Sequence, residues 1–123
     1  MISKMQDPWL QRYWREVLPR LWKELKPKRV ILFGSRVQGK AEEPSDLDVV
    51  VVSETFAQIP FLERLAFMMR RFPFPKHVDY LCYTPEEWRR IYPKSFILAE
   101  AVRTGLEVTS ETEIDQQPMP LQA

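Results

Sequence analysis

Two of the three glycines in the chain lie in a short segment between two strongly hydrophobic runs, and this pattern limits the fold more than any other feature of the sequence. The segment extends from Gly34 to Asp48, and residues 30–33 before it and 49–52 after it are wholly apolar. Short apolar runs of this kind are typical of buried strands, so residues 29–33 and 47–53 are predicted strands. A loop of about a dozen residues joins them, and neighbouring antiparallel strands accept such a loop.

Helical spacing of apolar residues predicts helices on both sides of these two strands. The first extends from Pro8 to Leu25, where Asp7 is a suitable N-cap and Pro19 is expected to kink or divide the helix. The crossover helix after the second strand permits a parallel third strand. The remaining predicted elements are helices near 58–71, 85–92 and 96–104, a strand at 77–83, and a short edge strand at 106–108.

These elements predict an α/β fold of the α+β type, with a mixed β-sheet of three to four strands packed with helices in a single domain. The 123 residues are enough for one hydrophobic core and too few for two. We expect the domain to occupy residues 1–109, with its core motifs at 29–83. The polar, proline-containing segment 110–123 is expected to be a disordered tail.

Charge and cysteine content argue against several classes of protein. The 18 basic and 17 acidic residues give a net charge of +1, which does not support a large nucleic-acid-binding face. No apolar run approaches the roughly 20 residues of a membrane-spanning helix. The single cysteine rules out an internal disulfide, and a cytoplasmic location is the simplest expectation. The oligomeric state stays open, since the apolar face of the first helix could pack on the sheet or form a subunit contact.

Three aspartates are predicted to meet at one end of the sheet. Asp46 and Asp48 stand two residues apart in an extended segment, so their side chains share a face with Cα atoms roughly 6.6 Å apart. Asp79 lies near the start of the neighbouring predicted strand. Carboxylates so close repel each other unless a cation lies between them, and Mg²⁺ prefers oxygen ligands. The three aspartates therefore predict a two-metal site for phosphoryl transfer, whereas His77 lacks companions for a zinc site and is expected to be structural.

Gly34 and Ser35 are candidates for a phosphate-binding turn opposite these carboxylates. Glycine lets the backbone approach a phosphate closely, and backbone N–H groups and a serine hydroxyl donate to phosphate oxygens. Arg36 and Lys40 are candidate charge partners of the phosphates. Each of these motifs taken singly is more typical of a turn or a solvated strand end, and their convergence is what favours a site. A P-loop is a weaker interpretation, because Ala41 stands where that motif needs a serine or threonine.

The spacing of these motifs closely resembles that of the nucleotidyltransferase superfamily of DNA polymerase β. The resemblance consists of a Gly-Ser pair at 34–35, ten further residues, an Asp-Leu-Asp triplet at 46–48 and a Val-Asp pair at 78–79. It covers residues 29–83, about half of the chain, and the small size is similar to that of the minimal nucleotidyltransferases of bacteria and archaea. The larger members of the superfamily carry an additional domain for which this chain has no length.

The resemblance implies a mixed-sheet catalytic core that uses ATP or another nucleoside triphosphate with two magnesium ions. It implies transfer of a nucleoside monophosphate, AMP in the leading interpretation, to a hydroxyl while pyrophosphate leaves. Position by position, Ser35 would hold the triphosphate, Asp46 and Asp48 the metal ions, and Asp79 the catalytic metal and the acceptor.

Minimal members that this chain resembles often act with a separate helical HEPN protein, as the antitoxin to its toxin, and some add AMP to a tyrosine of that partner. The resemblance therefore implies a HEPN-type protein partner. A second hypothesis is a non-catalytic antitoxin module that binds nucleotide and partner and neutralises the partner by direct contact. The three intact aspartates favour the enzyme over the contact module.

Overall fold

A four-stranded sheet forms the centre of the molecule, with the strand order β3-β2-β1-β4. The computed structural model describes residues 5–111 and residue 114. β1 pairs antiparallel with both β2 and β4, and β2 pairs parallel with β3, so the mixed sheet and its predicted pairing directions are confirmed. The strands are β1 (Arg29–Phe33), β2 (Leu47–Val52), β3 (Val78–Tyr83) and β4 (Leu106–Val108).

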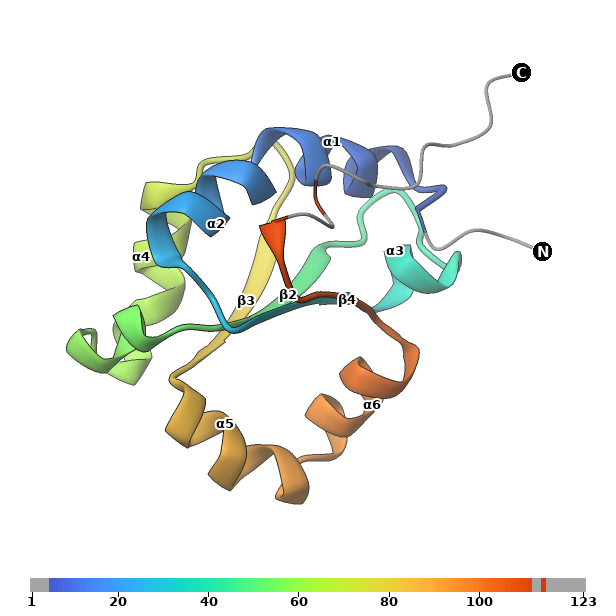
Figure 1. Cartoon of the computed structure of the whole chain (residues 1–123). Coiled ribbons are helices and arrows are strands. Elements are labelled where there is room, and N and C mark those ends of the chain that lie inside the picture. Colours follow the sequence, from blue (N-terminus) through green and yellow to red (C-terminus); the bar gives the residue numbers. More distant parts are fainter. Residues whose placement is uncertain (1–4, 112–113, 115–123) are drawn as a thin grey trace.

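Helices cover both faces of the sheet (Figure 1). Strand side chains alternate between the two layers, because successive residues of a strand point to opposite faces. Val49 and Val51 of β2 pack in one core layer, while Val50 and Val52 pack in the other, and all four are buried. The first layer is formed by α1 (Pro8–Glu16), α2 (Leu18–Leu25) and α4 (Arg64–Arg71), and the second by α5 (Pro85–Ile91) and α6 (Phe96–Thr104).

The strand register brings the predicted functional segments to one end of the sheet. Phe33, the last residue of β1, pairs with Asp48, and Asp48 pairs in turn with Asp79. After β1 the chain passes through Gly34 into the short helix α3 (Ser35–Gln38). The exit of β1 and the entries of β2 and β3 therefore lie side by side.

The first predicted helix is divided in two. α1 ends at Glu16, α2 begins at Leu18, and Val17 separates them. Pro19 occupies the first turn of α2, where the missing N–H has no helical partner in any case. Asp7 caps α1 as expected, because its Oδ1 accepts hydrogen bonds from the N–H groups of residues 9 (2.8 Å) and 10 (3.2 Å).

The prediction of a helix over residues 58–71 is wrong for the first half of that range. Residues 54–58 and 61–63 form 3-10 turns, and the α-helix begins only at Arg64. Pro60 separates the two turns, because it is extended, with a ψ of 143°, and has no N–H to donate. The later helices and the edge strand β4 lie within two residues of their predicted bounds.

The predicted tail lies largely outside the described residues, and its disorder stays a prediction. Within it, Ile114 is buried, and its carbonyl oxygen accepts a hydrogen bond of 2.9 Å from the Trp14 indole of α1. Among the described residues, every helix is too short or too polar to cross a membrane.

Candidate active site

The three predicted aspartates lie at one end of the sheet, and two of them share a face by their place in the strands. Val78 and Tyr80 of β3 pack in the layer of α1, α2 and α4, so Asp79 between them belongs to the opposite face. Asp48 lies on that same face, because its neighbours Leu47 and Val49 pack in the α1 layer. Asp46 comes two residues before Asp48, just ahead of β2.

Asp46, His77 and Asp79 form a compact cluster of ligating atoms. One ligand atom of each lies within 4.8 Å of the others, a spacing at which a single metal ion could contact all three. The Nε2 atom of His77 is 3.6 Å from Oδ1 of Asp79. From the sequence, His77 was expected to be structural, yet its ring lies beside the aspartates. Its position, one residue before the Val-Asp pair of β3, was the signal for this.

Asp48 lies next to this cluster, and the pKa of its carboxyl group is raised. Its pKa is raised from 3.8 to about 6, first by burial of its carboxyl group and then by the negative charges of Asp79 and Asp46. The His77 ring acts in the opposite direction. Three carboxylates at half-buried and exposed positions, with the pKa of Asp48 raised by burial and by its acidic neighbours, fit the oxygen-donor set of a divalent cation such as Mg²⁺.

Gly34 is required where β1 leaves the sheet, for two separate reasons. Its φ of 88° is a conformation that other residues rarely adopt. A Cβ atom at this position would also lie far inside contact distance of the Asp48 carboxylate. The backbone at 34 therefore packs directly on the carboxyl group of Asp48, and any side chain would displace it.

Arg36, predicted as a charge partner of the phosphates, instead binds groups of the protein itself. It is buried, with a relative exposure of 6%, and all three of its guanidinium nitrogens bond within the protein. They donate to Oδ2 of Asp7 (2.8 Å) and to the carbonyl oxygens of Ser45 (2.9 Å) and Glu43 (2.9 Å). Because the loop that it fastens leads directly into Asp46, Arg36 positions an acidic residue and is not available as a phosphate partner.

The other phosphate candidates stay next to the carboxylates. Ser35 begins α3 directly after Gly34. Gly39 ends α3 with a φ of 75°, and the Lys40 N–H donates to the Ser35 carbonyl oxygen (2.9 Å), which closes this turn tightly. The Lys40 residue is exposed, so its ammonium group remains a candidate charge partner.

Comparison with known proteins places the chain in a family. The family model of the nucleotidyltransferase domain matches residues 12–108. A relative from Haemophilus influenzae, described as "Probable protein adenylyltransferase MntA", is 34% identical over 77 residues, which cover 61% of this chain and 68% of the relative. A crystal structure from Sulfolobus solfataricus, described as that of a candidate nucleotidyltransferase, is 26% identical and covers 72% of this chain and 76% of its own, with a TM-score of 0.46.

The family match includes all four strands and every residue of the acidic cluster. The chain therefore belongs to the nucleotidyltransferase domain family, as an enzyme of the minimal nucleotidyltransferase type.

Proposed function

We propose that this enzyme transfers AMP from ATP to a hydroxyl group of a protein. The observation that carries the proposal is the convergence of Asp46, Asp48 and Asp79 at the sheet end where Gly34 and Ser35 leave β1. The description of the Haemophilus influenzae relative as a protein adenylyltransferase supports AMP as the transferred group and protein as the acceptor.

Each part of the site has a separate task in this reaction. Gly34 and Ser35 bind the triphosphate with backbone N–H groups and the hydroxyl, and Lys40 adds a positive charge. Asp46 and Asp48 hold divalent magnesium, and Asp79 completes the set together with the His77 ring. Magnesium, when bound, neutralises phosphate charge and lowers the pKa of the acceptor hydroxyl.

The bond changes follow from this arrangement. The acceptor oxygen bonds to the α-phosphorus of ATP, the bond from that phosphorus to the β-phosphate bridging oxygen breaks, and pyrophosphate leaves. Asp79 is the residue placed to receive the hydroxyl proton, since it lies on β3, on the far side of β2 from the phosphate turn. Its exposed position leaves it open to an incoming acceptor.

A HEPN-type toxin is the proposed partner, with a tyrosine of that protein as the acceptor and this chain as the antitoxin. A contact-only antitoxin is the second candidate. The observation that favours it is a set of large apolar residues left in solvent, among them Leu62, with a relative exposure of 91%, and Phe96, with 81%. Exposed apolar residues of this size commonly mark protein contacts.

One experiment separates the two candidates. The enzyme, the product of the adjacent gene, magnesium and ATP labelled on the α-phosphate are incubated together, and the label on protein is measured. Label on a partner tyrosine that disappears with Asp46→Asn or Asp79→Asn supports AMP transfer. Full neutralisation of the partner by both variants, with no label transferred by the wild type, would establish the contact module instead.

A further inference from the structure

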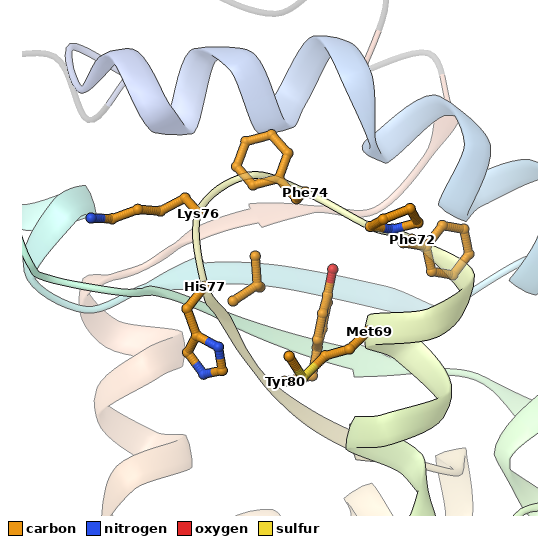
Figure 2. A pocket seen from close by; sticks show the side chains of 8 residues that line it. Met69, Phe72, Phe74, Lys76, His77 and Tyr80 are labelled. Atoms are coloured by element: carbon orange, nitrogen blue, oxygen red, sulfur yellow. The ribbon is translucent and has the colours of Figure 1, made fainter.

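A pocket of about 160 Å³ lies at the start of β3, on the face opposite Asp79. We name it the β3 pocket, and Figure 2 shows side chains that surround it. The residues used in the argument are Met69, Phe72, Phe74, Lys76, His77 and Tyr80. We infer that this pocket binds an aromatic side chain of the acceptor protein, while the hydroxyl that receives AMP approaches Asp79 around the edge of β3.

The pocket and the acidic cluster share one residue. His77 lines the pocket, and its Nε2 atom is 3.6 Å from Oδ1 of Asp79. In Figure 2 the imidazole ring points away from Phe74 and from α1, toward the face that carries Asp79. The pocket and the proposed catalytic carboxylate therefore lie on opposite faces of the edge strand β3, and His77 at the start of the strand adjoins both.

The strand order indicates the direction from which the acceptor arrives. The proposed phosphate turn follows β1, Asp46 and Asp48 lie just before and at the start of β2, and Asp79 belongs to β3, which is an edge strand. Attacking and leaving oxygens lie roughly in line in phosphoryl transfer. With pyrophosphate leaving on the β1 side, the acceptor must approach over β3, where the β3 pocket lies. This step rests on the proposed function.

The size and lining of the pocket select a single ring. A dry apolar cavity of about 150 Å³ is enough for benzene, whereas pockets for drug-sized ligands start near 300 Å³. Phe72, Phe74 and Tyr80 supply aromatic walls, and Met69 adds a flexible thioether that packs well on rings. The volume fits one aromatic side chain and is too small for a whole nucleotide.

The walls of the pocket are held in place by contacts within the protein, before any ligand binds. The Tyr80 hydroxyl forms a buried hydrogen bond of 2.7 Å with the Tyr13 hydroxyl. The Phe74 ring packs edge-on against Trp9, with centroids 5.8 Å apart, and against Tyr13, with centroids 5.5 Å apart. A pocket held open by such contacts loses little conformational entropy when a ring enters.

The surroundings of the pocket favour a protein over a nucleotide. The Lys76 ammonium group donates to the Glu43 carbonyl oxygen (2.5 Å), so it is bound to the loop before β2 and does not offer a free charge to phosphates. Met69 has a relative exposure of 44%, and the apolar residues Leu65 and Leu62 continue from it along α4 and the turn before it. This apolar stripe gives an acceptor protein a surface next to the pocket.

Binding is tested first without any acceptor protein. The full chain, labelled with ¹³C in its methionine methyl groups, is titrated with N-acetyltyrosinamide, N-acetylphenylalaninamide and N-acetylalaninamide. We expect the two aromatic amides to shift the Met69 methyl signal saturably and the alanine amide to leave it unchanged. Equal shifts with all three amides, or a saturable shift of this methyl with adenosine alone, would overturn the inference.

Substitution then tests the link to catalysis. Met69→Trp places a large ring at the mouth of the pocket. Ile97→Trp is the matched control, because Ile97 is similarly exposed (53%), lies on α6 in the other helical layer and does not line the pocket. We expect Met69→Trp to raise the KM for the acceptor protein at least tenfold, with unchanged affinity for magnesium ATP and an unchanged circular dichroism spectrum. The control variant is expected to match the wild type in acceptor KM.

The outcomes distinguish the inference from the proposed function. AMP transfer by the wild type with an unaltered acceptor KM in Met69→Trp overturns the pocket assignment and leaves the function standing. If the wild type binds magnesium ATP but transfers AMP to no protein, the proposed function is overturned, and the acceptor role of the pocket with it.

Discussion

The backbone of Gly34 packs directly against the carboxyl group of Asp48, so that the phosphate turn and a proposed metal ligand are in contact. Phe33 and Asp48 are paired across β1 and β2, which fixes this contact through the sheet ladder. A change in the backbone at Gly34 should therefore move the Asp48 carboxylate as well.

Gly34→Ala should disable the site, and Gly39→Ala is its matched control. Both glycines have positive φ, 88° and 75°, so either substitution should destabilise the fold by about 1 kcal/mol or more. Only at 34 does the new Cβ strike Asp48, whereas nothing lies within 4 Å of a Cβ at 39. We expect a loss of roughly 100-fold in AMP transfer for Gly34→Ala alone, since small displacements of reacting groups have effects of this size. Equal activity losses in both variants would show that backbone strain, and not the contact with Asp48, is what matters.

Asp48 should make the metal-free protein less stable as the pH rises. Its folded pKa of about 6 lies above the unfolded value of 3.8, so between these values the folded state holds the extra proton and stability falls with rising pH. Asp48→Asn removes this loss, so the variant should gain stability relative to the wild type from pH 4 to pH 7. Thermal melts in EDTA across this range test the difference, and parallel curves for the two proteins would contradict the cause given for the raised pKa.

Magnesium should reverse this pH dependence. A cation requires the ionised form of Asp48, so affinity for Mg²⁺ should rise as the pH increases through about 6. At a concentration 100 times its Kd, bound Mg²⁺ stabilises a protein by about 2.7 kcal/mol. We expect this stabilisation at pH 7.5 in the wild type and its loss in Asp46→Asn, measured by melting with Mg²⁺ and then with excess EDTA. A magnesium-induced shift of equal size in the variant would remove Asp46 from the ligand set.

Arg36→Lys should weaken magnesium binding at the site, although Arg36 itself does not contact the substrate. Lysine keeps the charge next to Asp7 but cannot reproduce the guanidinium bonds to the Ser45 and Glu43 carbonyl oxygens. We expect a loss of about 1–3 kcal/mol in the free energy of unfolding and a higher Mg²⁺ concentration for half-maximal activity. Denaturant titration measures the first and a magnesium activation curve the second. An unchanged magnesium requirement in a destabilised variant would limit Arg36 to a purely structural role.

The sheet could be predicted from the sequence because each of its strands has a recognisable local pattern of apolar residues. The valine run at 49–52 needs cover on both faces, and two core layers supply it. The spacing of Asp46 and Asp48 and the position of Asp79 follow from strand geometry alone. Capping at Asp7 is equally local and was predicted with the first helix, and the capping box of Thr84 and Glu87 that begins α5 is local in the same way.

What the sequence could not show depends on contacts between distant segments. An arginine beside a Gly-Ser turn is as suitable for a phosphate as for carbonyl oxygens, and only the folded loop shows that Arg36 is enclosed by residues 42–45 and Asp7. His77 stands two residues before Asp79, but Asp46 joins the two of them only when β2 and β3 pair. The β3 pocket likewise brings together α4, the connector after it and β3.

The most direct test of the acidic site is AMP transfer from labelled ATP by Asp46→Asn and Asp79→Asn, in proteins shown to be folded. Removing a carboxylate from a site that stabilises a charged transition state should lower the rate by at least ~100-fold. We expect this loss for both variants, together with the loss of stabilisation by Mg²⁺. Near-normal transfer by either variant would contradict the central claim that these carboxylates, converging at one end of the sheet, form the catalytic metal site.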